Sequence, residues 1–120
     1  MKLKVNGNVQ LLHLAFSNII SNGSKYCDFK TVTVSIGASD DFVYVVIKDL
    51  GIGIPEDEVQ YIYDPFFRAS NTKNYEGYGI GLPLTRNIIR MHNGKIFVNS
   101  IQDQGTTVQI TIPTWKPEAV

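Results

Sequence analysis

The sequence predicts an α/β domain in which helices pack on one face of a mixed, mainly antiparallel sheet. The chain has 120 residues, with 43% hydrophobic and 18% charged, which fits one folded globular domain. Its apolar residues change between helical spacing and strand alternation along the chain. The order is helix, two strands, two helices, two strands, and two layers bury the apolar sides of such elements most simply.

The first expected helix follows Asn8, a residue type that caps helix N-termini. It should end near Gly23, because glycine commonly follows the last helical residue. A short edge strand is expected over residues 3–5. The helix is predicted from the spacing of its apolar residues: Val9, Leu12, Phe16, Ile19 and Ile20.

Two strands are expected next. Residues 31–36 alternate and are rich in β-branched side chains. After a turn at Asp40 and Asp41, residues 42–47 are apolar on both faces, which predicts a central strand. Pro55 then opens a short helix over 56–63, whose acidic first turn suits the helix dipole.

The second half of the chain begins with a polar stretch, residues 68–78, that reads as a loop. A helix should start near Gly81, with Pro83 in its first turn, where its missing N–H costs little. Asn93 and Gly94 end that helix. The last unit is a hairpin of strands 95–101 and 106–112.

Composition excludes several classes of protein. The single cysteine, Cys27, cannot form an internal disulfide. Eleven basic and eleven acidic residues cancel, which argues against a nucleic-acid binder. No apolar stretch is long enough to span a membrane, and the residues after Met1 do not form a signal peptide. We therefore expect residues 1–120 to form a single cytoplasmic domain that is monomeric when isolated.

The first candidate motif lies at the end of the first helix. Asn18 and Asn22 are four residues apart and so share one helix face, and Lys25 follows three residues later. An amide oxygen is a hard neutral ligand that Mg²⁺ accepts beside phosphates, and a lysine would meet phosphate charge. Taken alone, the motif is more often a solvated polar stripe.

The second motif follows the central strand. Asp49 is spaced with Gly51 and Gly53. Glycines let the backbone approach a ligand closely, and the carboxylate could accept a hydrogen bond from an exocyclic amine. An ordinary strand-ending turn is an equally good reading of so short a motif.

The third motif enters the later helix. Gly77, Gly79 and Gly81 precede Leu82 at a spacing of two. They would expose N–H groups beside the positive end of a helix and so form an anion cradle. The spacing is not the dinucleotide fingerprint, and a flexible linker is an equally common reading.

The fourth motif, Gly105-Thr106-Thr107, opens the final strand. A hydroxyl there could join a ligand network, although alone the motif is merely a good hairpin.

In their order and intervals, the four motifs resemble the N, G1, G2 and G3 boxes of the GHKL ATP-binding superfamily, which includes gyrase, MutL, the large heat-shock chaperones and histidine kinases. Residues 63–68, Tyr-Asp-Pro-Phe-Phe-Arg, resemble the F box typical of histidine kinases. The similarity covers residues 8–113. It implies the Bergerat-type fold of the catalytic, ATP-binding domain of a sensor histidine kinase.

The resemblance also implies roles at the base and metal sites. Asn22 is similar to the residue that coordinates the Mg²⁺ on the ATP phosphates, and Lys25 to the basic residue facing those phosphates. Tyr26 resembles the aromatic packed against the adenine region. Asp49 resembles the carboxylate that receives the adenine N6 amine, with room for the base provided by Gly51 and Gly53.

Around the phosphates, the resemblance implies that Arg68 approaches the γ-phosphate. Residues 69–76 would form a lid. The residues that would close around the phosphates are Gly77, Gly79, Gly81 and Leu82. Thr107 resembles the hydroxyl residue near the adenine and Asp49. Two departures from the family pattern, Gly23 for alanine and Pro83 for a small residue, should be tolerated.

Asn18 distinguishes transfer from hydrolysis. ATP-hydrolysing members of the superfamily carry a glutamate base at this position, and a neutral amide cannot remove a proton from water. The catalytic residues implied are therefore Asn18, Lys25 and Arg68, with transfer to a histidine. His13 reads as a surface helix residue and His92 as a cationic helix end that favours the dipole. Neither resembles a phosphoacceptor.

The implied cofactors are ATP and Mg²⁺. The implied partners are a histidine-containing dimerisation domain, absent from residues 1–120, and a response regulator downstream, within a parent that can be anchored in the inner membrane. Two alternatives stay open: a protein-serine or anti-sigma kinase of the same fold, and a non-catalytic nucleotide-sensing module.

Overall fold

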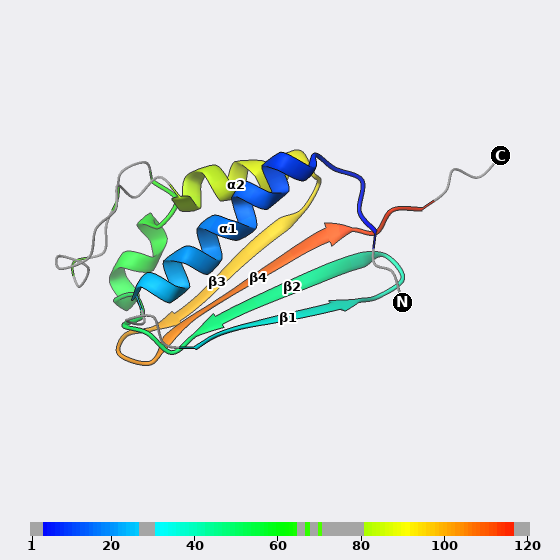
Figure 1. The fold of residues 1–120 in the computed structure, drawn as a ribbon. Helices are drawn as coiled ribbons and strands as arrows, with labels where there is room; N and C mark the ends of the chain where they lie inside the picture. Colours follow the sequence, from blue (N-terminus) through cyan, green and yellow to red (C-terminus); the bar gives the residue numbers. More distant parts are fainter. Residues whose placement is uncertain (1–3, 27–30, 65–66, 68–69, 71–80, 117–120) are drawn as a thin grey trace.

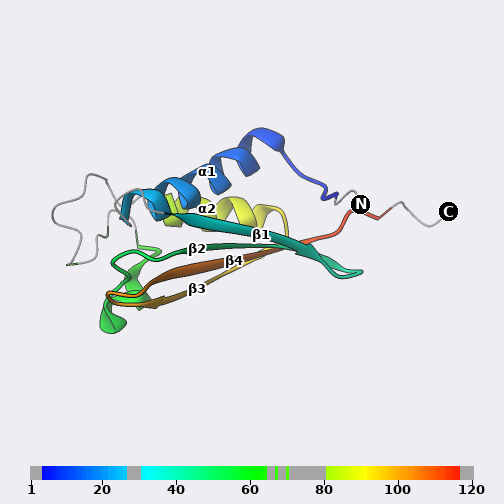
Figure 2. The same cartoon turned by 60° about the horizontal axis from the view of Figure 1, so that its bottom comes forward.

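The protein is a two-layer domain with helices on one face of a four-stranded sheet (Figures 1 and 2). The computed structural model describes residues 4–26, 31–64, 67, 70 and 81–116, with backbone alone for 23–26 and 81. The elements along the chain are α1 (Val9–Tyr26), β1 (Val32–Ala38), β2 (Phe42–Asp49), the 3-10 helix η1 (Glu56–Tyr61), α2 (Gly81–Met91), β3 (Lys95–Ile101) and β4 (Gly105–Pro113). The predicted order of elements is confirmed.

The sheet has the strand order β1-β2-β4-β3, and all three pairings are antiparallel. β2 is central, as predicted from its apolar character on both faces. β3 runs in the same direction as β2, but the β3–β4 hairpin places β4 between them. The expected mixture with parallel pairs is therefore not seen among the described strands.

The helix α1 begins where the sequence predicts. The side-chain oxygen Oδ1 of Asn8 accepts the backbone N–H of Leu11 at 3.0 Å, the hydrogen bond of an N-cap. The predicted end near Gly23 is wrong, because α1 continues to Tyr26. Glycine costs only about 1 kcal/mol inside a helix, so it does not end a helix by itself. The helix therefore extends through position 25.

Smaller differences concern the ends of other elements. The predicted helix over 56–63 is the 3-10 helix Glu56–Tyr61. The expected edge strand over 3–5 is reduced to one bridge between Val5 and Thr114. The helix α2 starts at Gly81 and ends before Asn93, whose positive φ of 58° turns the chain as predicted.

The core lies between the two layers. Its buried side chains come from both helices and from the two central strands: Ala15, Ile19, Ile47, Ile88, Ile89, Val108, Ile110 and Ile112. On β4 the even-numbered residues from 108 to 112 are buried, so the even-numbered side of this strand faces the helices. No helix in the described part of the chain has the length and apolarity needed to cross a membrane.

Candidate functional site

The described parts of the first, second and fourth motifs lie toward one end of the sheet, where β2 ends and the β3–β4 hairpin turns (Figure 1). The centre of this end is Asp49. Its Oδ1 accepts the backbone N–H of Gly51 at 2.9 Å and that of Thr106 at 3.3 Å. Within the described residues both hydrogen bonds fall on Oδ1, so Oδ2 is the oxygen available to a ligand.

The carboxyl group of Asp49 is partly buried, and this changes its acidity. Burial raises the pKa of Asp49 above its usual value, and the hydrogen bonds from Gly51 and Thr106 only partly offset that rise. Asp49 lies two residues after Ile47 on β2, so the two side chains point to the same face of the sheet, and that of Ile47 is buried against the helices. The carboxylate therefore points into the space between sheet and helices rather than to the open face.

The loop after Asp49 is locked to the hairpin by close backbone packing. Gly53 is buried with φ +65°, and a Cβ there would lie 2.1 Å from the carbonyl oxygen of Ile101. Gly105 has φ +131°, and a Cβ there would lie 2.2 Å from the carbonyl oxygen of Asp49. Both positions require glycine because of φ and because of space. The hydrogen bond from Asp103 N–H to the Ile52 carbonyl, 2.7 Å, joins the same two segments.

A hydroxyl pair supports the site, and the sequence analysis missed it. Ser100 Oγ lies 2.7 Å from Thr106 Oγ1 and accepts the backbone N–H of Ile54 at 2.8 Å. Thr106 stands opposite Ser100 on the neighbouring strand, and both lie on the helix-facing side. This pair links the loop after Asp49 to the hairpin.

The position of Thr107 differs from expectation. Its register partner is Lys48, whereas Thr106 is the residue that bonds Asp49. Because successive side chains of a strand point to opposite faces, Thr107 lies on the side away from the helices. The hydroxyl on the Asp49 side is that of Thr106, one residue earlier than predicted.

The two asparagines of the first motif lie on α1. Asn18 and Asn22 are one turn apart and partly buried, so they share a helix face. The backbone of Lys25 and Tyr26 continues the helix, and their side chains lie outside the described part. No group of three or more His, Cys, Asp or Glu side chains able to hold a metal occurs among the described residues.

The phosphate motifs are described only in part. Gly81 is the first residue of α2, as predicted, and Leu82 follows it, partly buried. Pro83 occupies the first turn. Arg68, Gly77 and Gly79 lie outside the described residues, as do the residues of the expected lid apart from Ser70.

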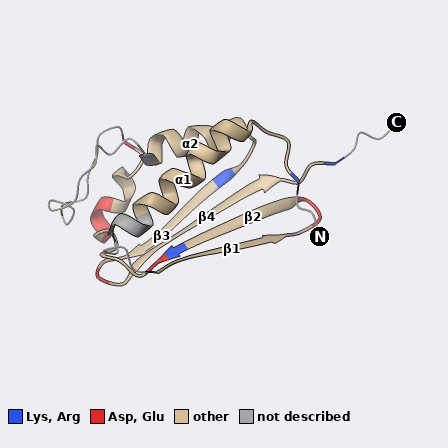
Figure 3. Cartoon of the chain, in the orientation of Figure 1, with Lys and Arg blue, Asp and Glu red and all other residues tan. Residues whose placement is uncertain are grey.

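Tyr63 belongs to the F-box-like segment and packs against α2. The guanidinium of Arg86 lies over its ring, 4.6 Å from the centroid. Burial raises the pKa of the Tyr63 phenol, although the positive charges of Arg86 and Arg90 oppose the rise. Tyr63 is therefore uncharged at neutral pH, and its ring is the aromatic face on which the Arg86 guanidinium lies. The first turn of η1 carries the acidic residues Glu56, Asp57 and Glu58 (Figure 3).

The two histidines differ in their surroundings. His13 is exposed on α1, as predicted. The expectation of a cationic His92 is wrong: its ring is buried, Nδ1 lies 2.7 Å from the Ile88 carbonyl, and Nε2 accepts the Asn8 N–H at 3.0 Å. A ring that accepts through Nε2 and donates through Nδ1 is the neutral tautomer.

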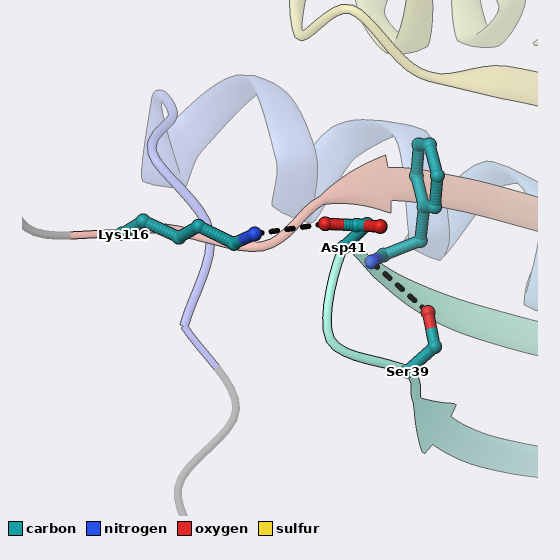
Figure 4. A network of polar contacts seen from close by, with 4 residues as sticks. Ser39, Asp41 and Lys116 are labelled. Atoms are coloured by element: carbon teal, nitrogen blue, oxygen red, sulfur yellow. Dashed lines mark hydrogen bonds and ion pairs between the residues drawn. The ribbon is translucent and has the colours of Figure 1, made fainter.

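The opposite end of the domain contains none of the motif residues that the structure describes. A cavity of about 580 Å³ lies there, between the start of α1, the end of α2 and the end of β4. Its lining includes His92 and Trp115. Close by, Lys116 Nζ contacts Asp41 at 2.8 Å, and the Phe42 N–H donates to Ser39 Oγ at 3.3 Å (Figure 4). The contact of Lys116 with Asp41 joins the β1–β2 turn to the segment after β4, and the hydrogen bond between Phe42 and Ser39 closes the turn itself.

Comparison with known proteins agrees with the geometry. Residues 7–116 match the family described as histidine kinase-, DNA gyrase B-, and HSP90-like ATPase. The chain is 35% identical over 101 residues to the sensor histidine kinase WalK of Bacillus subtilis, covering 80% of the chain and 16% of WalK. It is 40% identical over 111 residues to the adaptive-response sensory kinase SasA of Rippkaea orientalis, covering 91% of the chain and 28% of that kinase.

Two further relatives extend the comparison. The sensor histidine kinase RcsC of Escherichia coli K12 is 32% identical over 113 residues, covering 92% of the chain and 12% of RcsC. The solved structure of the mycobacterial sensor histidine kinase MprB superposes with a TM-score of 0.85 at 27% identity, covering 93% of the chain and 78% of that structure. The chain thus spans less than a third of the length of the curated relatives WalK, SasA and RcsC.

Proposed function

Since the chain belongs to the family of histidine kinase-, DNA gyrase B- and HSP90-like ATPases, we propose that it binds Mg-ATP and donates the γ-phosphoryl group to a histidine on a separate dimerisation domain. The transfer would serve two-component signalling, with a response regulator receiving the phosphoryl group next. The proposal rests mainly on the carboxylate of Asp49. Its Oδ1 accepts hydrogen bonds from Gly51 and Thr106, so its Oδ2 would accept one from the adenine N6 amine. Guanine has a carbonyl at that place and would be repelled.

The base site is proposed to consist of Asp49 and its supports. The backbone hydrogen bonds from Gly51 and Thr106 fix the carboxylate before the base arrives, so little ordering is needed on binding. Gly53 lets the loop after Asp49 pack closely on the hairpin beside the base, because of its positive φ and its lack of a Cβ. We assign the accessory hydroxyl to Thr106 rather than Thr107, because Thr106 lies on the same side as Asp49. Tyr26 is proposed to pack against the adenine region.

The phosphate site is proposed to lie between α1 and the N-terminus of α2. Asn22 would hold Mg²⁺ with the phosphate oxygens, and its partly buried amide is a ligand type that Mg²⁺ accepts. When bound, Mg²⁺ supplies neutralisation of phosphate charge. Lys25 and Arg68 would add positive charge, and Gly77, Gly79, Gly81 and Leu82 would bring backbone N–H groups to the phosphates.

Asn18 decides the fate of the phosphoryl group in this proposal. It stands one turn before Asn22, where a base would have to act on water, and an amide cannot accept that proton. A positioned histidine nucleophile needs no such base from this domain. The domain then contributes positioning and charge stabilisation, which carry most of the catalysis in phosphoryl transfer.

The experiment incubates the chain with γ-³²P-labelled Mg-ATP, alone and with a helical dimerisation domain that bears an accessible histidine. The chain alone should bind Mg-ATP, hydrolyse it negligibly and acquire no stable label. The partner should acquire label that is labile to acid and stable to base, as expected for a phosphoramidate. Brisk hydrolysis by the chain alone would refute the role given to Asn18, and acid-stable label on a partner serine would favour the serine kinase. Binding without transfer to any partner would favour a nucleotide-sensing module.

A further inference from the structure

The side chain of Ser100 contacts two segments of the chain at the same time. Its Oγ accepts the backbone N–H of Ile54, in the loop after Asp49, at 2.8 Å. The same oxygen lies 2.7 Å from Thr106 Oγ1 and 3.3 Å from the Gly105 carbonyl oxygen, both at the start of β4. One hydroxyl group thus joins the loop to β4.

The bonds of this hydroxyl can be counted, because a serine has one proton to donate and two lone pairs that accept. The Ile54 N–H uses one lone pair. The proton goes either to the Gly105 carbonyl or to Thr106 Oγ1, and in the first case the Thr106 hydroxyl donates to the second lone pair. In both arrangements Ser100 bonds the loop and β4 together. Alanine at this position would remove both connections.

The two segments that Ser100 joins are those that fix the carboxylate of Asp49. Its Oδ1 accepts one N–H from Gly51, in the loop, and one from Thr106, in β4. The bond from Thr106 is 3.3 Å long, which is longer than usual for an N–H and an oxygen. A small separation of the loop from β4 would therefore break it. The position of the carboxylate depends on how closely the two segments are held.

Other contacts between the loop and the hairpin involve the backbone and do not depend on Ser100. The Asp103 N–H donates to the Ile52 carbonyl at 2.7 Å. Gly53 packs so closely that a Cβ there would lie 2.1 Å from the Ile101 carbonyl oxygen. These contacts remain when Ser100 is replaced, so the domain should still fold. What changes is the position of the loop near Ile54, and with it the position of Asp49.

We infer that Ser100 is a positioning residue that sets the selectivity of the base site for a 6-aminopurine. It holds the loop and β4 at the separation at which Gly51 and Thr106 both reach Asp49. The inference rests on the proposed function and adds a residue that lies outside the sequence motifs. A carboxylate fixed in advance needs little ordering when the base binds. A carboxylate that moves loses its contact with the N6 amine, whereas the phosphate contacts elsewhere in the site are kept.

The test compares, by calorimetry, the affinities for Mg-ATP and for the Mg²⁺ complex of purine riboside triphosphate, which has a hydrogen in place of the N6 amine. The ratio of the two affinities is the preference for the amine. The variants are Ser100→Ala, Ser100→Thr, Asp49→Asn and the double variant of Ser100→Ala with Asp49→Asn. Ser39→Ala is the matched control, because Ser39 Oγ also accepts a backbone N–H, that of Phe42, at the other end of the sheet. Thermal unfolding of each variant reports the fold.

The wild type should prefer ATP about tenfold, as expected for a charge-assisted hydrogen bond to the amine. Ser100→Ala should reduce the preference to about threefold, because the carboxylate is no longer fixed. Ser100→Thr keeps the hydroxyl and should stay within about twofold of the wild type. The double variant should show the same preference as Asp49→Asn, since Ser100 acts through Asp49. Ser39→Ala should leave both affinities unchanged.

Three results would overturn the inference. They are an unchanged preference in Ser100→Ala, an equal fall in affinity for both ligands, and a further loss of preference in the double variant. A wild-type chain that binds neither ligand would instead refute the proposed function, and the role of Ser100 with it. If Ser100→Ala does not fold, Ser100→Cys decides, because a thiol fills nearly the same space but accepts hydrogen bonds weakly.

Discussion

The imidazole Nε2 of His92 accepts the backbone N–H of Asn8 at 3.0 Å, joining residues 84 positions apart. Asn8 caps α1, and His92 follows the last turn of α2, so this bond joins the start of one helix to the end of the other. A Cβ on Gly7 would lie 2.4 Å from the ring, which shows how closely the chain covers it.

His92→Ala should therefore destabilise the domain by about 2–3 kcal/mol, because it leaves a cavity and removes the partner of a part-buried N–H. Urea unfolding measures the change. His13→Ala, an exposed histidine on α1, should change the free energy of unfolding by less than about 0.5 kcal/mol. Equal effects of the two substitutions would contradict the role of His92. The ¹⁵N chemical shifts of the ring should show the neutral tautomer with the proton on Nδ1.

Asp49→Asn should separate stability from binding. The pKa of Asp49 is raised in the folded state, so its contribution to stability is full below the unfolded pKa and is lost as pH rises through the folded pKa. Asparagine keeps an oxygen for Gly51 and Thr106 without the charge. The variant should be at least as stable as the wild type at pH 7, and this advantage should shrink as the pH falls through the raised folded pKa of Asp49 and be gone below the ordinary carboxyl pKa.

The same variant should bind Mg-ATP at least about tenfold more weakly, roughly 1.4 kcal/mol, because a charge-assisted hydrogen bond is lost. Calorimetry at pH 7 measures the affinity, and thermal unfolding at several pH values measures the stability. A parallel loss of affinity and stability would mean that Asp49 acts only on the fold.

Gly53→Ala should damage both the fold and the site. The added Cβ would lie 2.1 Å from the Ile101 carbonyl oxygen, and alanine disfavours the positive φ. We expect a loss of about 2–4 kcal/mol in the free energy of unfolding and weaker Mg-ATP binding. Urea unfolding and calorimetry provide the two values. A variant as stable as the wild type would show that the loop after Asp49 need not pack on the hairpin.

Thr85→Val should stabilise the protein. Thr85 is fully buried, and its hydroxyl has no hydrogen-bond partner among the described residues. Replacing it with an isosteric methyl group removes an unpaired polar atom, which should raise the free energy of unfolding by about 1 kcal/mol. Thr85→Ala is the comparison, since it also removes the methyl group and should lower stability. A destabilised valine variant would indicate that the hydroxyl is bonded after all.

The sequence predicted the fold closely because the helices and strands carry clear apolar periods. β2 is central, as its apolar faces indicate, and Asn8 caps α1. The predicted end of α1 was wrong because a glycine inside a helix costs only about 1 kcal/mol, and the other contacts along the helix outweigh so small a cost.

The supporting parts of the site could not be found in the same way. Thr106 and Ser100 act through the register of two strands, and a short motif does not reveal which of two adjacent threonines faces the helices. The neutral ring of His92 depends on Asn8, far away in the sequence.

The position of β4 between β2 and β3 has a consequence for how the protein is made. Translation produces β4 last among the strands, yet this strand supplies Val108, Ile110 and Ile112 to the core. A nascent chain still lacking residues 105–113 has a β1–β2 hairpin and an unpaired β3, with no sheet to join them. The domain can therefore complete its core only after β4 has left the ribosome. Until then its helices expose apolar faces on which a chaperone could act.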